Sequence, residues 1–178
     1  NYFDPSTDEW KHFGYQPEFL NSLNSDALYD LMFDSSNNLW IGTFNGGINL
    51  HKTVFPPFVM DRQYALERLE GLRSVLCLDQ DKDGNVWMGT DGGGLFQLDV
   101  RNKPVQLVSI EKSSKHPTGL NVITSLASLP DGNLWLGTFA RGLYLYKPGA
   151  GIVKQYQNIS GDPTSLSHNN VWDLGCGG

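Results

Sequence analysis

Long apolar runs and clusters of basic residues are missing from this sequence of 178 residues, and cysteine is scarce. A helix that spans a bilayer needs about 18 consecutive apolar residues, and no run approaches that length. Asn1–Pro5 contains neither a basic nor an apolar stretch, so we expect no signal peptide within the sequence. The formal net charge is −6. We therefore expect no nucleic-acid partner and no membrane contact by this segment.

The residues that usually hold metals or perform catalysis form no recognisable set. The two cysteines, Cys77 and Cys176, lie about 100 residues apart, a spacing that does not indicate a disulfide. Cys77 lies in a strand-like run and is expected to be a small buried hydrophobic residue. The four histidines lack metal-ligand spacing, and no Ser, His and Asp occupy a catalytic context. We therefore predict no metal, no cofactor and no catalytic residue, although paired carboxylates of a glycosidase type would leave no mark in the sequence.

Glycine, proline and tryptophan are by contrast plentiful, at 20, nine and five residues. The glycines and prolines fall between short apolar runs, which is typical of an all-β protein rich in turns. The sequence also repeats itself: Leu39–Thr43 returns as Val86–Thr90 and again as Leu134–Thr138. The tryptophans of these segments are 47 and 48 residues apart, and a glycine follows each threonine four residues later. Such a period indicates stacked structural units of near-constant length.

Each unit contains four short apolar runs separated by turn residues, which is the pattern of one propeller blade. Helical repeats are disfavoured because Gly-Thr, Pro-Pro and Asp-Gly pairs interrupt every candidate helix. We therefore predict an all-β fold: a β-propeller fragment with about three complete four-stranded blades and partial blades at both ends. The expected boundaries are 1–27 for the end of a preceding blade and its link, 28–74, 75–121 and 122–170 for blades, and 171–178 for the start of another.

The repeated residues are expected to serve packing. They are Trp40, Gly42, Thr43, Trp87, Gly89, Thr90, Trp135, Gly137 and Thr138. A tryptophan in each blade can fill the wedge between neighbouring sheets, and the glycine two residues later permits close approach of the next blade. The glycines at 47, 94 and 142 suit a backbone with positive φ at the entry to the third strand.

The segment from Val75 to Leu95 resembles the two-component regulator propeller repeat, and Ser165–Val171 resembles that family's link into a new blade. The resemblance implies a non-catalytic segment of the periplasmic sensor region of a hybrid two-component histidine kinase, of the kind found in Bacteroidetes. It further implies recognition of glycan-derived oligosaccharides. Kinase, receiver and DNA-binding parts are outside this sequence.

Ligand contacts are expected in the loops that differ between repeats, because function in a repeat protein sits where the units differ. The candidates are Phe44, Arg73, Asp91, Asn121, Phe139, Arg141 and Asn169. Aromatic rings could stack on sugars, and polar side chains could bond hydroxyls or acidic groups. A protein-interaction scaffold and a propeller lyase or hydrolase are the alternative functions. The EF-hand-like Asp79-x-Asp81-x-Asp83-Gly84 lacks the Glu that would complete a calcium loop, because Thr90 occupies that position, so we expect a hairpin turn there.

The chain is short for a closed ring. Seven blades of this size would need roughly 335 residues, and even a small propeller has about four blades. Open sheet edges invite pairing with another chain. We therefore expect self-association through the open blade edges, with two copies completing one ring.

Overall fold

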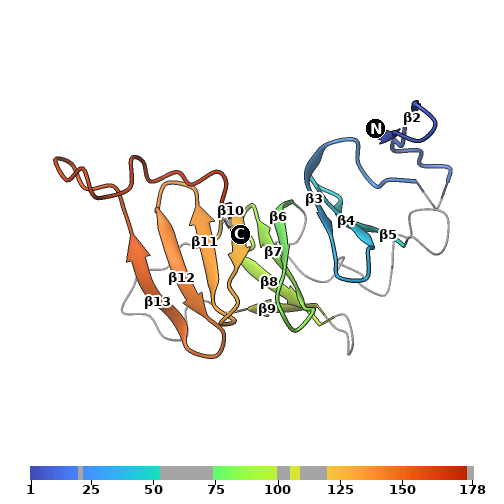
Figure 1. Cartoon of the computed structure of the whole chain (residues 1–178). Helices are drawn as coiled ribbons and strands as arrows, with labels where there is room; N and C mark the ends of the chain where they lie inside the picture. The colour runs from blue at the N-terminus through green and yellow to red at the C-terminus, as the bar shows by residue number, and fades with distance from the viewer. Residues whose placement is uncertain (20–21, 53–73, 100–104, 109–119, 176–178) are drawn as a thin grey trace.

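The computed structural model describes residues 1–19, 22–52, 74–99, 105–108 and 120–175. Within these ranges every regular element is a β-strand, and a two-stranded hairpin precedes three larger antiparallel sheets. Figure 1 shows the three sheets following one another along the chain. The all-β propeller architecture expected from the repeat is confirmed. Since the described residues contain no helix, they contain no helical membrane span.

The strands are consecutive in each sheet, so each sheet is a simple meander. The strands are β1 (Tyr2–Asp4), β2 (Glu9–Lys11), β3 (Leu28–Phe33), β4 (Leu39–Thr43), β5 (Gly47–His51), β6 (Val75–Gln80), β7 (Val86–Thr90), β8 (Leu95–Leu98), β9 (Val105–Val108), β10 (Ile123–Ser128), β11 (Leu134–Thr138), β12 (Leu143–Lys147) and β13 (Gly151–Tyr156). The sheets β6–β9 and β10–β13 have four strands each, and β3–β5 has three. The stretch where a fourth strand of the first unit is expected, 53–73, lies outside the described residues.

The first strands of the sheets converge, since β3 contacts β6 and β6 contacts β10. Residues 171–174 continue the series: the Val171 N–H donates to the Thr138 carbonyl at 3.1 Å, and the Val171 carbonyl accepts the Thr124 hydroxyl. In a propeller the strands that converge in this way surround the central channel. The inner wall of this fragment is therefore built by β3, β6, β10 and residues 171–174.

Tight turns with an aspartate at their start join the first two strands of the first two sheets. The Asp81 carboxylate accepts hydrogen bonds from the backbone N–H groups of Asp83 and Asn85, and from the Trp87 indole at 2.8 Å. Asp34 has the same role, and its second carboxylate oxygen accepts the Trp40 indole N–H at 2.9 Å. The segment that resembles an EF-hand loop is thus a hairpin turn, as expected. Each aspartate holds both the turn and the tryptophan of its own sheet.

Hydrogen bonding also sets the acidity of Asp34. Burial alone would raise the pKa of this carboxyl, but hydrogen bonds from Trp40, Asn38 and Ser36 outweigh it and lower the pKa. A lowered folded-state pKa contributes stability that is present above the unfolded value and is lost as the pH falls through the folded one. The contact therefore weakens only in acid.

The tryptophans of the first two sheets pack against the following sheet. Trp40 and Trp87 are both 2 % exposed. Trp40 lies in one core with Val75, Leu78 and Val86, and Trp87 lies in a second core with Ile123, Leu126 and Leu134. The Trp87 ring meets the Tyr146 ring edge-on with 6.1 Å between centroids. Burying such a ring removes about 150–250 Å² from water, worth about 4–6 kcal/mol before entropy costs. The wedge between neighbouring blades is therefore the hydrophobic core.

The third sheet departs from this scheme. Leu129 stands where Asp34 and Asp81 stand in the other turns, so it cannot accept an indole N–H. Trp135 is only half-buried, and its ring lies 5.5 Å from that of Tyr156. At the opposite end of the array, Leu31 and Phe33 of β3 are 59 % and 63 % exposed. Trp40 is the residue equivalent to Trp135, and it packs on the following sheet. Leu78 is the residue equivalent to Leu31, and it packs on the preceding sheet.

Bare backbone at one glycine per sheet permits the close approach of the next sheet. A Cβ on Gly42 would lie 3.0 Å from the Val75 carbonyl oxygen, and one on Gly137 would lie 3.0 Å from that of Val171. A Cβ on Gly89 would lie 2.9 Å from the Ile123 carbonyl oxygen. Val75 and Ile123 begin β6 and β10, and Val171 begins the segment 171–174, which takes the equivalent place after the third sheet. The blades therefore meet backbone to backbone at this level.

The expected positive φ before the third strand is confirmed. Gly47, Gly94 and Gly142 have φ values of 74°, 79° and 83°. The buried Thr90 hydroxyl donates to the Gly94 carbonyl at 2.9 Å, and Thr43 and Thr138 make the same bond to the glycine four residues on. This bond closes the turn between the second and third strands.

Gly89→Ala should destabilise the fold by about 1–3 kcal/mol, the usual cost of overpacking. The new methyl group would press on the Ile123 carbonyl and on the Cys77 sulfur, both of which are held by the core. Urea unfolding measures the loss. Gly175→Ala is the control, since nothing lies within 4 Å of its Cβ position. Equal midpoints for the two variants would contradict the close-approach argument.

Asp81→Ala should cost about 1–3 kcal/mol, because it leaves the buried Trp87 indole N–H without its acceptor. Asp131→Ala, in the equivalent turn of the third sheet, should cost less, since among the described residues only Asn133 donates hydrogen bonds to the Asp131 carboxylate. Thermal unfolding of both variants provides the comparison. A larger loss for Asp131→Ala would show that the indole bond is not what stabilises these turns.

Candidate functional site

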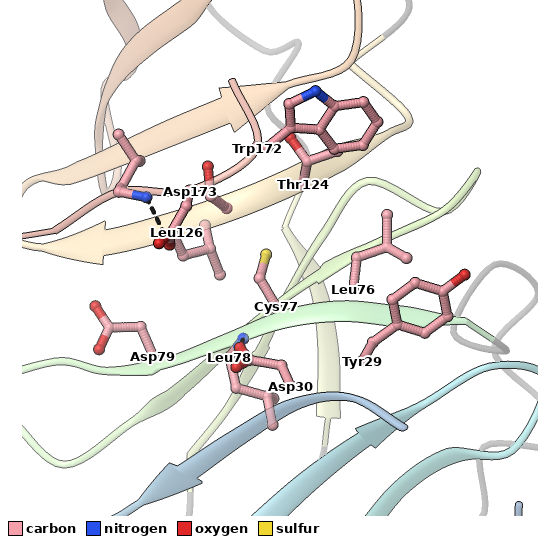
Figure 2. Close-up of a pocket in the computed structure, with 12 residues that line it drawn as sticks. Tyr29, Asp30, Leu76, Cys77, Leu78, Asp79, Thr124, Leu126, Trp172 and Asp173 are labelled. Carbon is pink, nitrogen blue, oxygen red and sulfur yellow. Dashed lines mark hydrogen bonds between the residues drawn. The ribbon is translucent and has the colours of Figure 1, made fainter. Parts of the chain in front are cut away.

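A cavity of about 440 Å³ opens on the inner wall of the fragment. Its lining comes from β3, β6, β10 and residues 171–174, and Figure 2 shows the side chains that face it. The lining residues are Tyr29, Asp30, Leu76, Cys77, Leu78, Asp79, Thr124, Ser125, Leu126, Trp172, Asp173 and Leu174. The candidate site is thus built by the first strand of each of the three sheets and by residues 171–174, at the place where a propeller has its channel.

Aromatic rings gather at one end of this cavity. Tyr29 and Trp172 line it and are 54 % and 66 % exposed. Tyr29 lies 6.0 Å from Phe44, and Trp172 lies 5.9 Å from Phe139, as measured between ring centroids. Phe44 and Phe139 are themselves 41 % and 49 % exposed. The Tyr29 and Trp172 rings thus provide flat apolar surfaces at the cavity, of the kind that ligand sites use, and each is backed by a second exposed ring.

Carboxylates supply the polar part of the lining. The two oxygens of Asp30 accept the backbone N–H groups of Leu31 and Leu78 at 2.8 and 2.6 Å, so Asp30 joins the first sheet to the second. Asp79 joins the second sheet to the third by accepting the Ser128 N–H. Burial raises the pKa of Asp30, and repulsion from Asp173 and Asp79 adds to the rise. These carboxylates therefore both fasten blades and charge the channel.

Cys77 lies between the blades rather than in a reactive position. Its side chain is buried, and its sulfur donates to the Ile123 carbonyl across the interface at 3.5 Å. Burial raises the pKa of the thiol, so it stays protonated and unreactive. The expectation that Cys77 is a small buried residue is confirmed. Cys176 lies outside the described residues.

The loop residues predicted from sequence divide into two groups. Phe44 and Phe139 lie beside the aromatic end of the cavity, against Tyr29 and Trp172. The structure describes four of the other predicted residues: Asp91, Asn121, Arg141 and Asn169. Their hydrogen bonds lie within and between the loops that connect the strands. Arg73 lies outside the described residues.

The contacts of this second group hold the chain in place. The Asp91 N–H donates to the Ser74 carbonyl, and the Asn121 carbonyl accepts the N–H groups of Gly92 and Gly94. The Asn169 side chain accepts the Asn158 N–H at 2.7 Å. The Arg141 carbonyl accepts the Gln155 side chain at 3.0 Å. None of these four residues lines the cavity.

The lining residues that sequence reasoning missed occupy equivalent repeat positions. Tyr29, Leu76, Thr124 and Trp172 correspond to one another, as do Asp30, Cys77, Ser125 and Asp173. Variation at both positions is visible in the sequence and could have marked them. Attention to loops alone overlooked variation within the first strand.

The family model of the two component regulator propeller matches residues 22–45, 70–92 and 119–140. Each match spans the first two strands of one sheet, including the tryptophan strand. The chain carries the two component regulator propeller repeat. The cavity is therefore lined by the first strand of each propeller repeat and by the segment that follows the third. No curated protein matches the sequence.

Solved structures share the architecture of the propeller repeat. The extracellular domain of the hybrid two component system BT4673 of B. thetaiotaomicron is 22% identical with a TM-score of 0.71, and the match covers 94% of this chain and 21% of that one. The corresponding domain of BT3049 from the same organism is 28% identical with a TM-score of 0.62, covering 76% and 18%. PorZ, a surface component of the type-IX secretion system of Porphyromonas gingivalis, is 18% identical with a TM-score of 0.69, covering 97% and 26%. The chain thus spans about a fifth to a quarter of these relatives.

Tryptophan fluorescence should report the open aromatic end of the cavity. Trp172 is 66 % exposed, whereas Trp87 is 2 % exposed. Trp172→Phe should therefore lower the fraction of emission that acrylamide quenches readily, and Trp87→Phe should raise it. Unchanged quenching in Trp172→Phe would show that this ring does not face solvent in the protein.

Proposed function

We propose that this chain is a ligand-sensing segment of a two component sensor protein, lies outside the cytoplasm, and binds an oligosaccharide at its channel cavity. The propeller repeat and the extracellular domains of the similar hybrid two component systems support the sensor role. These relatives also support an extracellular or periplasmic location. The observation that carries the ligand proposal is the pair of exposed rings that line the cavity, Tyr29 and Trp172, each in contact with a further exposed ring, Phe44 or Phe139.

The chemistry of the cavity suits a sugar chain. Sugar rings have apolar faces that lie on aromatic side chains, and hydroxyl groups that donate to carboxylates. The Tyr29 and Trp172 rings offer the first kind of contact, and Asp173 offers the second (Figure 2). The volume of about 440 Å³ is within the usual range of small-ligand sites.

The place of the cavity in the propeller also suits a sensor. The lining residues come from three sheets and from residues 171–174, so one ligand would touch several blades at once. Asp30 and Asp79 line the cavity and also fasten neighbouring blades through backbone N–H groups. A ligand at this place would stabilise the blade arrangement that binds it best. Binding is thereby coupled to the geometry of the ring.

Calorimetry of the intact sensor against an oligosaccharide panel tests the proposal. Trp172→Ala should weaken binding about tenfold, which corresponds to 1.4 kcal/mol. Trp10→Ala is the matched control: Trp10 is 70 % exposed but belongs to the N-terminal hairpin β1–β2, so its loss should leave affinity unchanged. Absence of binding across a broad panel, or equal losses in both variants, would overturn the proposed function. Capture of a protein ligand in place of a sugar would favour the scaffold alternative.

A further inference from the structure

A single asparagine of the sequence is followed by a glycine. Asn45 and Gly46 lie in the connection between β4 and β5, where Asn45 is exposed and has a φ of 59°. An asparagine followed by glycine can react with its own backbone. The next amide nitrogen lies close to the carbonyl carbon of the side chain, and glycine brings no side chain that would block the approach. The pair is therefore a candidate for a covalent change that needs no enzyme.

Hydrogen bonding distinguishes Gly46 from the other glycines that follow an acidic or amide residue. The sequence has three Asp-Gly pairs, and the N–H of the glycine donates to a carbonyl in each: Gly84 to Asp81 at 3.0 Å, Gly92 to Asn121 at 2.8 Å and Gly132 to Leu129 at 2.9 Å. The Gly46 N–H donates no hydrogen bond to any residue that the structure describes. A nitrogen that holds a hydrogen bond must give it up before it can attack a neighbouring carbon, at a cost in free energy. Gly46 does not bear that cost.

A hydroxyl group lies at the carbonyl oxygen that the reaction would charge. The Ser74 hydroxyl donates to the side-chain oxygen of Asn45 at 3.5 Å, and the Asn45 N–H donates to the Ser74 hydroxyl oxygen at 3.3 Å. Ser74 is 6 % exposed, so its hydroxyl is held in place. Attack on an amide places negative charge on the amide oxygen, and a donor at that oxygen stabilises the charge. The loop thus combines an unbonded nitrogen with a carbonyl that is prepared for attack.

Packing requires a glycine at position 46. The Asn24 side chain donates to the Gly46 carbonyl. A Cβ on Gly46 would lie 2.7 Å from the Thr43 hydroxyl oxygen, closer than real Cβ atoms come to their neighbours. The fold therefore demands the same residue that makes Asn45 reactive.

We propose that Asn45 deamidates spontaneously in the folded protein, through attack by the unbonded Gly46 nitrogen. This nitrogen loses its proton to solvent and bonds to the side-chain carbonyl carbon of Asn45. The bond from that carbon to the amide nitrogen breaks, and ammonia leaves. Water then opens the five-membered imide at either carbonyl, so the net reaction consumes one water and releases one ammonia. One opening gives aspartate at position 45, and the other gives isoaspartate, whose main chain runs through the former side-chain carbon.

The two products act differently on the loop. Aspartate, like asparagine, tolerates a positive φ, so this product keeps the turn and makes the formal net charge of −6 more negative by one. Isoaspartate lengthens the main chain directly after Phe44, whose ring lies 6.0 Å from the Tyr29 ring at the channel cavity. Deamidation therefore alters the surroundings of the cavity as the molecule ages.

Peptide mapping by mass spectrometry tests the proposal on the intact protein, incubated without denaturant at mildly alkaline pH while circular dichroism shows that it stays folded. Asn121 is the internal control, because it is also exposed but precedes the β-branched Val122. Residue 45 should exchange its amide for a carboxyl group at least about tenfold faster than residue 121. The rate should rise with pH, because the attacking nitrogen must lose its proton. Equal rates at the two positions, or a change at residue 45 that occurs only in urea, would overturn the proposal.

Asp91→Asn provides a matched variant within the same molecule. It creates a second Asn-Gly pair in the corresponding connection of the second sheet, where the Gly92 N–H is bonded to the Asn121 carbonyl. Position 91 of this variant should deamidate about tenfold more slowly than Asn45, since its nitrogen must first lose a hydrogen bond. If position 91 reacts as fast as Asn45, the unbonded N–H of Gly46 is not what makes Asn45 reactive, and the proposed route is wrong.

Discussion

The close contact of one sheet with the first strand of the next is the constraint on which the rest of the structure depends. Gly42, Gly89 and Gly137 place bare backbone against the carbonyl groups of Val75, Ile123 and Val171. Because the sheets approach so closely at this level, Trp40 and Trp87, each two residues before its glycine, reach the following sheet and fill the wedge. The same contact draws the first strands together, so the residues of β3, β6 and β10 come to share one inner wall. The channel cavity is a consequence of that packing.

One repeat position within this scheme holds a different residue in each blade, although all of these residues bond to the following blade. Asp30, Cys77 and Ser125 all reach the following blade: Asp30 accepts the Leu78 N–H, and Cys77 and Ser125 donate to the carbonyls of Ile123 and Val171. A donor and an acceptor both satisfy the interface, because the backbone offers both kinds of group. The interface therefore tolerates either chemistry, which leaves this position free to set the charge of the channel. At Asp30 this position carries a carboxyl group, and burial of that group raises its pKa.

Much of the architecture could be predicted from the sequence, because the features that repeat are those that packing demands. The Trp-x-Gly-Thr pattern and its period of about 48 residues indicated sheets of about four strands. The positive φ at Gly47, Gly94 and Gly142 followed from the same pattern. Strand ends were less certain: the first strand of the third unit begins at Ile123, while Val122 forms only an isolated bridge to Asp91. Such ends depend on tertiary pairing, which propensity does not encode.

The candidate site was harder to predict, because its residues are far apart in the sequence and join only through the ring. Phe44 and Phe139 could be named, since they are aromatic residues in variable loops. Their ring partners Tyr29 and Trp172 lie in and beside first strands, where alternation suggests only a half-buried sheet. Tyr29 was missed for a local reason. The register of β3 against β4 shifts between Leu28 and Asp30, and this irregularity interrupts the strict alternation of side chains on which a sequence argument relies. The equivalent shifts at Leu76 and Thr124 place those residues at the same cavity. The same register shift in each of the three sheets thus accompanies one variable side chain per sheet at the channel, so the fold holds its packing constant while its inner surface changes.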